Sequence, residues 1–390
     1  NATIPSCAPG LGCARPLAMV QAGQHADELQ ELIEFLSDKR APVRTHAAEL
    51  VEGLTGSPEG MSTLSNRADT LLPPLLRLIA DTTEASRPAL TALVNLAQEP
   101  GVQSALLALH APARAMDYLR ENACAHPGLL ISLLANLTAS EDGSEALLQL
   151  GQSSVEGLHT ATLLKLFLQP VVGSEDTYEH VATILPNVTR LAAGRQLLLQ
   201  PGRGLLTALS SQLRSKSELR RRGSARAIKN CFFAAEEDGT LEDILAEEAA
   251  LTTMLDVISG GEAEGEADGE AREALSEALL CLVRVPTARK VLWRLDAPKL
   301  IGKGYELEEH RGVCAAMEAI AEFFLEDGFG EEGGKEGPVE DGPAGFVMPE
   351  PGFLPPGVAQ GLSPSARRHS SGETSLPSNP HRLAHIEEIE

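Results

Sequence analysis

The sequence predicts an all-α protein, an armadillo/HEAT-like right-handed helical solenoid with a disordered acidic C-terminal tail. Aromatic residues make up only 3% of the chain while Leu and Ala are abundant, so the core must consist of aliphatic helix formers rather than strand formers. A short pattern also recurs at intervals of slightly more than 40 residues, the period of such arrays. The end of the chain is rich in Gly, Pro and acidic residues.

These observations divide the 390 residues into three regions. We expect a disordered N-terminal segment over residues 1–24, a repeat array over 25–326 and a disordered tail over 327–390, where Gly, Pro and acids cannot repay the ordering entropy. An acidic insert over 259–270 interrupts the array. Within the tail, the run Arg-Arg-His before Ser370 has the form of a basophilic kinase site, a match short enough to arise by chance.

The repeat appears in four segments that share one order of residues. Apolar residues lead to an Asn, a Gly follows six to nine positions later, and a second apolar helix begins. The asparagines are Asn95, Asn136, Asn187 and Asn230, so the spacings are 41, 51 and 43 residues. Degenerate copies have Gly53 and Cys281 at the equivalent place. This period predicts units of two or three helices, each of which buries its apolar face against its neighbours.

Proline and glycine predict where the last helix of each unit begins and ends. A proline in the first turn of a helix loses no hydrogen bond, and a glycine often follows the last turn. We therefore expect these helices to begin near Pro42, Pro88 and Pro127 and to end near Gly56, Gly101 and Gly143. Pro186 lies inside the predicted helix that carries Asn187, where it removes a backbone hydrogen bond and introduces a bend.

Charge and composition exclude several classes of function. The formal net charge of −23 argues against a nucleic acid partner. No apolar run reaches the roughly 20 residues that cross a bilayer, so we expect no membrane partner. The six cysteines are scattered without a C-x-x-C pair, which suits reduced, buried thiols and a cytoplasmic location.

The sequence contains no signature of catalysis. Phosphate-binding glycine loops, zinc-ligand spacings and nucleophile elbows are all missing. We therefore expect no catalytic residue, no metal ligand and no cofactor. An enzyme that assembles its reactive groups from distant segments is the remaining alternative, and the sequence nominates no residue for it.

The four repeated asparagines are the first candidate site. Armadillo arrays line their groove with the last helices of successive units, so Asn95, Asn136, Asn187 and Asn230 could form a ladder of amides that binds an extended peptide backbone. In the alternative, which we favour, each amide bonds the backbone of a neighbouring unit. The Trp that precedes the Asn by four residues in nuclear import adaptors is replaced here, at Thr91, Ser132, Thr183 and Arg226.

A basic stripe is the second candidate site. Between Arg214 and Lys229 the sequence has seven basic residues and one acidic residue. Between Glu236 and Glu273 it has fourteen acidic residues and one basic residue. On a helix that begins near Glu218, Arg222, Arg226 and Lys229 share a face. We predict that this stripe binds an acidic segment of a partner, or that it neutralises the adjoining acids. Its residues are Arg220, Arg221, Arg222, Arg226 and Lys229.

The block "RRRGSARAIKNCFF" resembles the eukaryotic HGH homolog family, which has armadillo-like repeats and an R-R-x-G-x-x-x-x-x-[KR]-N-C-x-F motif. The match covers about residues 71–327. The match is carried by Arg221, Arg222, Ser224 (where the family can have a glycine), Lys229, Asn230, Cys231 and Phe233, and its spacing differs from the motif at individual sites.

This resemblance implies a function that the composition does not. The family implies a non-enzymatic, monomeric cytosolic chaperone adaptor that binds translation elongation factor two and promotes its folding with the chaperonin TRiC and Hsp90. The alternative is a general armadillo-type scaffold or transport adaptor that binds extended peptides.

Overall fold

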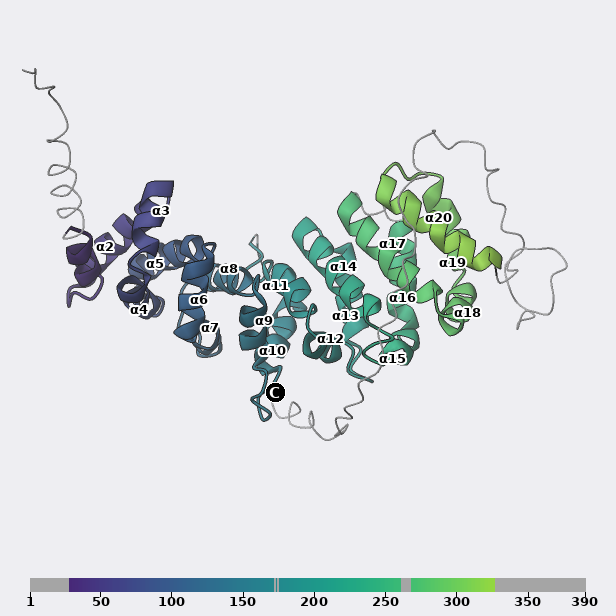
Figure 1. Ribbon diagram of the computed structural model, residues 1–390, viewed down its shortest axis with the longest axis horizontal. Coiled ribbons are helices and arrows are strands. Elements are labelled where there is room, and N and C mark those ends of the chain that lie inside the picture. The colour runs from purple at the N-terminus through teal and green to yellow at the C-terminus, as the bar shows by residue number, and fades with distance from the viewer. Residues whose placement is uncertain (1–27, 172, 174, 261–267, 327–390) are drawn as a thin grey trace, which may run out of the picture. The chain divides into compact units, whose positions relative to one another are not determined.

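The computed structural model describes residues 28–171, 173, 175–260 and 268–326. Over these residues every regular element is a helix (Figure 1), which confirms the predicted fold class. The predicted segments 1–24 and 327–390, with Ser370, lie outside the described residues. Two compact units contain the rest: the first runs to Leu147 and includes Pro170–Ile184, and the second combines Leu148–Gln169 with the residues from Leu185 on.

The sequence pattern corresponds to repeats of three helices, and the repeated asparagine lies on the third. Leu and Ala have high helix propensity, and the four repeated sequence segments are accordingly helical over most of their length. The third helices are α2 (Ala41–Leu54), α5 (Thr83–Leu96), α8 (Pro127–Leu137), α11 (Val181–Val188), α14 (Glu218–Phe233), α17 (Gly269–Val283) and α20 (Arg311–Glu326).

The first and second helices pack beside the third, and they are shorter than it in every described repeat except the one that ends in α11. The first helices are α3 (Pro58–Ser65), α6 (Pro100–Ala108), α9 (Glu141–Leu148), α12 (Ala192–Leu198), α15 (Leu241–Ala246) and α18 (Pro286–Arg294). The second helices are α4 (Ala68–Leu78), α7 (Ala111–Arg120), α10 (Leu158–Phe167), α13 (Leu205–Ser211, continued by the 3-10 helix η1, Gln212–Arg214), α16 (Glu248–Ile258) and α19 (Ala297–Tyr305).

Equivalent helices stack against one another within each unit. In the first unit α5 packs between α2 and α8, and in the second α17 packs between α14 and α20 (Figure 1). The second helices α13, α16 and α19 form a parallel row of contacts. Leucines dominate the interior, and Leu90, Leu93 and Leu96 of α5 are fully buried. Each such side chain contributes about 1.5–3 kcal/mol on burial, so the stacking supplies the main stabilisation.

The predicted helix starts are correct at two of three prolines. Pro42 and Pro127 lie in the first turns of α2 and α8. The prediction for Pro88 is wrong, because α5 begins at Thr83, where the side chain of Thr82 caps the helix by accepting from the Ala85 N–H. A capping hydroxyl one turn earlier therefore sets the helix start.

The predicted helix ends are correct only at Gly56, which lies in the turn after α2. Gly101 and Gly143 instead lie in the first turns of α6 and α9. At Gly143 the reason is close packing, since a Cβ atom there would lie 1.8 Å from the carbonyl oxygen of Leu137. Gly60 and Gly194 are equally close to the preceding third helix. A Cβ atom added at Gly60 would lie 2.0 Å from the Leu54 carbonyl oxygen, and one added at Gly194 would lie 2.1 Å from the Val188 carbonyl oxygen.

The predicted acidic insert is too long at its C-terminal end. Residues 261–267 lie outside the described residues, but Asp268 caps α17 by accepting from the Glu270 N–H at 3.1 Å, and Gly269 and Glu270 belong to that helix. An aspartate at the N-cap satisfies a backbone donor that the helix leaves unpaired. The described helix α17, with Asp268 as its N-cap, therefore takes in the last residues of the predicted insert.

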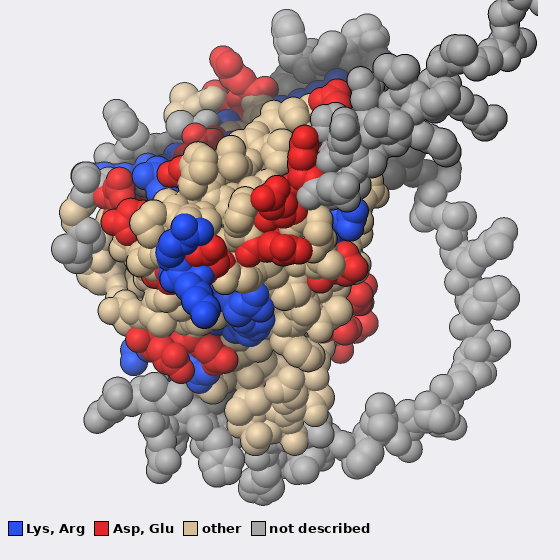
Figure 2. All heavy atoms as spheres, turned by 90° about the vertical axis from the view of Figure 1, so that its left-hand side faces the viewer, with Lys and Arg blue, Asp and Glu red and all other residues tan. Residues whose placement is uncertain are grey.

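Charges of both signs are interspersed on the surface. On the face shown in Figure 2, lysines and arginines lie beside groups of acidic residues, and uncharged residues fill much of the area between them. Among the described helices, none is both long and apolar enough to span a bilayer.

The close approach of Gly143 generates a test of the packing. Gly143→Ala inserts a methyl group against the Leu137 carbonyl, and overpacking of this kind costs about 1–3 kcal/mol. Gly101→Ala is the matched control, because nothing lies within 4 Å of its Cβ position and the alanine should be neutral or stabilise the helix by up to about 1 kcal/mol. Urea unfolding followed by circular dichroism measures both; equal midpoints for the two variants would contradict the packing account.

Candidate functional site

Three of the four repeated asparagines donate hydrogen bonds to the preceding repeat. Asn95 Nδ2 donates to Thr55 Oγ1 at 2.8 Å, and Asn136 Nδ2 donates to the Val94 carbonyl at 2.8 Å. Asn230 Nδ2 donates to the Pro186 carbonyl and to Thr189 Oγ1, both at 3.0 Å. These contacts match the alternative in which the amides tie neighbouring units together.

The acceptors explain why an amide is suited to this position. The last four carbonyls of a helix have no partner within the helix, and Val94 and Pro186 each lie in the last turn of their own third helix. An amide from the next repeat supplies the missing donor. Asn187 occupies the equivalent place on α11, half-buried, where its backbone carbonyl accepts from Arg190 Nε at 3.3 Å.

The predicted basic stripe forms on α14, the third helix that begins after Ser217. Ser217 caps this helix by accepting from the Arg220 N–H at 3.2 Å. Arg222, Arg226 and Lys229 follow at helical spacing and all meet acids of the next repeat, so they share a face as predicted.

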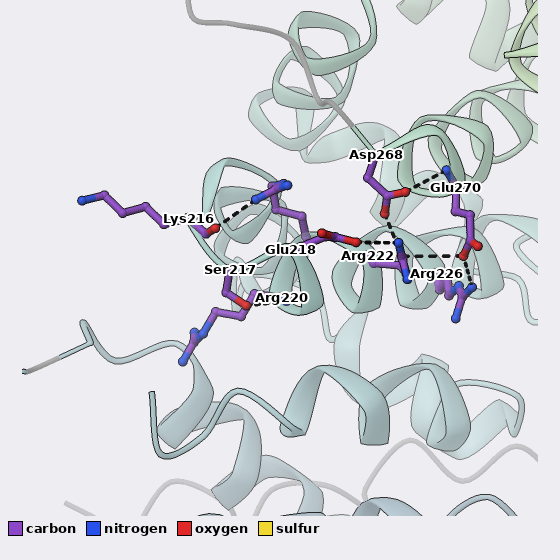
Figure 3. A network of polar contacts seen from close by, with 9 residues as sticks. Lys216, Ser217, Glu218, Arg220, Arg222, Arg226, Asp268 and Glu270 are labelled. Carbon is purple, nitrogen blue, oxygen red and sulfur yellow. Dashed lines mark hydrogen bonds and ion pairs between the residues drawn. The ribbon is translucent and has the colours of Figure 1, made fainter. Parts of the chain in front are cut away.

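The stripe is neutralised within the second unit (Figure 3). Arg222 Nε donates to Asp268 Oδ2 at 2.7 Å, and its Nη2 donates to Glu218 Oε1 at 2.6 Å. Arg226 Nη2 donates to Glu270 Oε2 at 2.6 Å. Lys229 pairs with Glu277 in the middle of α17. Two neighbouring third helices therefore carry matching columns of basic and acidic side chains.

Two predicted members of the stripe lie elsewhere, and the prediction for them is wrong. Arg220 is only 2% exposed, with its guanidinium carbon 4.3 Å from the centre of the Phe167 ring and Nη1 2.9 Å from Gln212 Oε1. Arg221 Nη1 donates to the carbonyls of Ser215 and Lys216, at 2.9 and 3.2 Å. Arg220 anchors α14 in the core, and Arg221 holds the loop before it.

The contact between Arg222 and Asp268 belongs to a repeated feature of the third helices. Arg44 near the start of α2 reaches Asp81 at 2.8 Å, and Arg272 near the start of α17 reaches Glu308 at 2.6 Å. In each case an arginine binds an acid just before the next third helix. The hydrogen bond from Arg222 lowers the pKa of Asp268 below its ordinary value, because it stabilises the ionised carboxylate.

The residues of the RRRGSARAIKNCFF block have different surroundings. Ser224 and Cys231 are completely buried in α14, and burial raises the pKa of the Cys231 thiol to about 12, so it is not a reactive thiol. Phe233, in contrast, is 75% exposed at the end of the helix. It lies eleven residues after Arg222, on the face of the stripe. The helical period could have identified it from the sequence.

No arrangement for metal binding is present among the described residues. These residues contain no cluster of three or more His, Cys, Asp or Glu side chains that could hold a metal ion. The four described cysteines are free, and Cys7 and Cys13 lie outside the described residues. The candidate site residues lie on the third helices.

Comparison with known sequences identifies relatives of this chain. Residues 118–285, which include the whole of α14 and α17, match the model of a domain of unknown function, DUF383. "Protein HGH1 homolog" of Xenopus tropicalis is 29% identical over 237 residues, or 60% of this chain and 64% of the relative. The Homo sapiens homolog is 30% identical over 53% of this chain and 54% of its own length. The chain thus matches about 64% of the length of the Xenopus relative.

Solved structures show the same fold. A structure described as computationally designed armadillo repeat proteins for modular peptide recognition aligns with a TM-score of 0.53 at 18% identity, over 64% of this chain and 98% of that chain. A structure from work on the phosphorylation-controlled interaction between cadherin and β-catenin aligns with a TM-score of 0.55 at 14% identity, over 75% of this chain and 51% of that chain. Both establish an armadillo-like fold.

The pair formed by Arg222 and Asp268 predicts a pH dependence. The pKa of Asp268 is lowered in the folded state. The contribution of its ionised carboxylate to the unfolding free energy is therefore complete above the ordinary carboxylate pKa, and it is lost as the pH falls through the lower, folded-state pKa. Arg222→Ala removes this contribution, so the variant should lose less unfolding free energy than the parent between pH 7 and about pH 3, by up to about 1 kcal/mol.

Arg226→Ala provides the control for this measurement. The Arg226 and Glu270 side chains are both about half exposed, 53% and 54%, and such pairs contribute only about 0–1 kcal/mol. Denaturant unfolding at each pH measures both variants. An unchanged acid sensitivity in Arg222→Ala would show that this contact does not stabilise the fold.

Proposed function

We propose, from the membership of this chain in the HGH1 homolog family as a distant homologue, that it is a non-enzymatic adaptor that binds a protein client on its third helices. The client that the family resemblance implies is translation elongation factor two, folded with the chaperonin TRiC and Hsp90 in the cytosol. None of the family descriptions reported above names an enzyme.

One observation carries the proposal. The family match at 118–285 includes all of α14 and α17. An exposed phenylalanine, Phe233, ends α14, and an exposed arginine, Arg284, directly follows α17. Aromatic and arginine side chains are the residue types that most often anchor protein interfaces. A large apolar side chain left in water at the end of a repeat helix supports a role in binding protein.

The contacts of the basic stripe support a structural role for these side chains rather than a role in binding the client. The cations of the stripe are balanced by Glu218, Asp268, Glu270 and Glu277. If these cations bound a client instead, their ion pairs would break and the four acidic side chains would lose their partners. We therefore assign Arg222, Arg226 and Lys229 to holding α14 against α17.

A general peptide-binding scaffold is the second candidate, favoured by the likeness to armadillo proteins designed for peptide recognition. In that function the asparagine amides would bind the peptide backbone. The amide nitrogens of Asn95, Asn136 and Asn230 already donate within the chain, so a peptide would have only their carbonyl oxygens. The proposed adaptor function does not require these amides to bind a partner.

Affinity capture tests the proposal. The immobilised full chain, incubated with native eukaryotic cytosol, should enrich elongation factor two and the chaperonin over a bait-free control, with both identified by mass spectrometry. If neither protein is in the bound fraction, the adaptor function is wrong. Recovery of unrelated proteins that share extended basic or apolar segments would favour the general scaffold.

A charge-swapped bait separates the two roles of the stripe. The double variant Arg226→Glu with Glu270→Arg reverses an exposed pair while preserving its attraction, so folding should be retained. The structural role predicts capture equal to that of the parent chain. A loss of capture of roughly ten-fold with an unchanged circular dichroism spectrum would instead assign the stripe to docking.

A further inference from the structure

An aromatic and an arginine side chain are left without partners at one end of the second unit. Phe233 ends α14 and is 75% exposed, in a chain in which only 3% of residues are aromatic. Arg284 follows α17, is exposed, and forms no ion pair with any described residue. The stripe cations before Phe233 all have acid partners. We call Phe233 and Arg284 the open edge.

Contacts at the helix ends place α14, α17 and α20 side by side at this edge. Lys229, one turn before Phe233, pairs with Glu277, two turns before Arg284. Arg289 then links the next two helices. Its Nη1 donates to the carbonyls of Val283 and Arg284 at the end of α17, while its guanidinium lies 5.8 Å from the ring of Phe323 near the end of α20.

The chain therefore leaves the folded unit beside the open edge. The last residue of α20 is Glu326, one helix away from Arg284 and two from Phe233. Packed helices lie about 8–10 Å apart, so the two distances are about 10 and 20 Å. An extended chain covers about 3.3 Å per residue, and about six residues are enough to reach Phe233.

The sequence that follows has the chemistry to bind this edge. Residues 327–390 lie outside the described residues, so only their sequence is considered. Seven acids and one lysine occur between Asp327 and Glu350, and the apolar run Phe346-Val347-Met348 follows the acidic pair Glu340-Asp341. Carboxylates bind guanidinium groups in pairs of charge-assisted hydrogen bonds, and aromatic rings stack.

We propose that residues 340–348 of this chain bind the open edge in cis, with the Glu340-Asp341 pair on Arg284 and Phe346 against Phe233. The order agrees with the geometry, since a chain that leaves α20 passes α17 before α14. Phe346 is five positions after Asp341, and an extended chain of that length spans more than the single helix spacing between the two anchors. A tether of this length also gives a high effective concentration.

The consequence is that the open edge is occupied by the protein itself until a ligand displaces that segment. A client or peptide with a carboxylate and an aromatic side chain would compete for the same two anchors. This inference does not depend on the identity of the client proposed above.

Photocrosslinking from position 233 tests the proposal in the full chain. The variant Phe233→p-benzoyl-phenylalanine, irradiated in dilute solution, should give intramolecular crosslinks to residues 340–348, with a yield that does not change on dilution. The matched control places the same residue at Leu307, which is 73% exposed and precedes α20 at its opposite end; it should not label those residues.

Arg284→Glu in the same background supplies the second readout. Reversing the charge should lower the yield roughly ten-fold, because carboxylates then face a carboxylate, while circular dichroism confirms that the helices are intact. Crosslinks between two chains, crosslinks to other segments, equal labelling from Leu307 or a yield unaffected by Arg284→Glu would each overturn the proposal.

Discussion

Hydrogen bonds from one third helix to the C-terminal end of the third helix before it join the repeats, and the stacking of the array depends on them. A helix leaves its last carbonyls without internal partners. Asparagine solves the problem where it donates to Val94 and Pro186. Thr189 extends the solution, because its hydroxyl donates to the Leu185 carbonyl while it accepts from Asn230. The amide ladder is thus a device for joining repeats.

The opposite ends of the third helices are joined by charge. Arg44, Arg222 and Arg272 each reach an acid just before the next third helix. Because these acids are mostly buried, with exposed fractions of 17%, 9% and 4%, their carboxylates need a cation close by. The amides at one end of these helices and the ion pairs at the other are thus committed to contacts within the array. Phe233 and Arg284 are exposed and make no such contact with the described residues.

The sequence predicts most of the fold because one pattern repeats. The asparagine spacing places the third helices, and the helical period correctly aligns Arg222, Arg226 and Lys229. It could not place Arg220, because that side chain packs on Phe167, 53 residues earlier, a contact set only by tertiary structure. Gly143 shows the same limit: it is required by a carbonyl of the preceding helix, whereas local rules suggest a helix end. The exposure of Phe233 likewise depends on what neighbouring repeats leave uncovered.

The central claim is that the repeated amides stabilise the array and do not bind a partner. Replacing Asn95, Asn136 and Asn230 together by alanine tests it, with denaturant unfolding and affinity capture measured on the same variant. The account predicts that the unfolding free energy falls by about 1 kcal/mol per amide, while capture by the folded variant is unchanged. Gln98→Ala, an exposed amide after α5, should change neither. Unchanged stability with loss of capture would contradict the account.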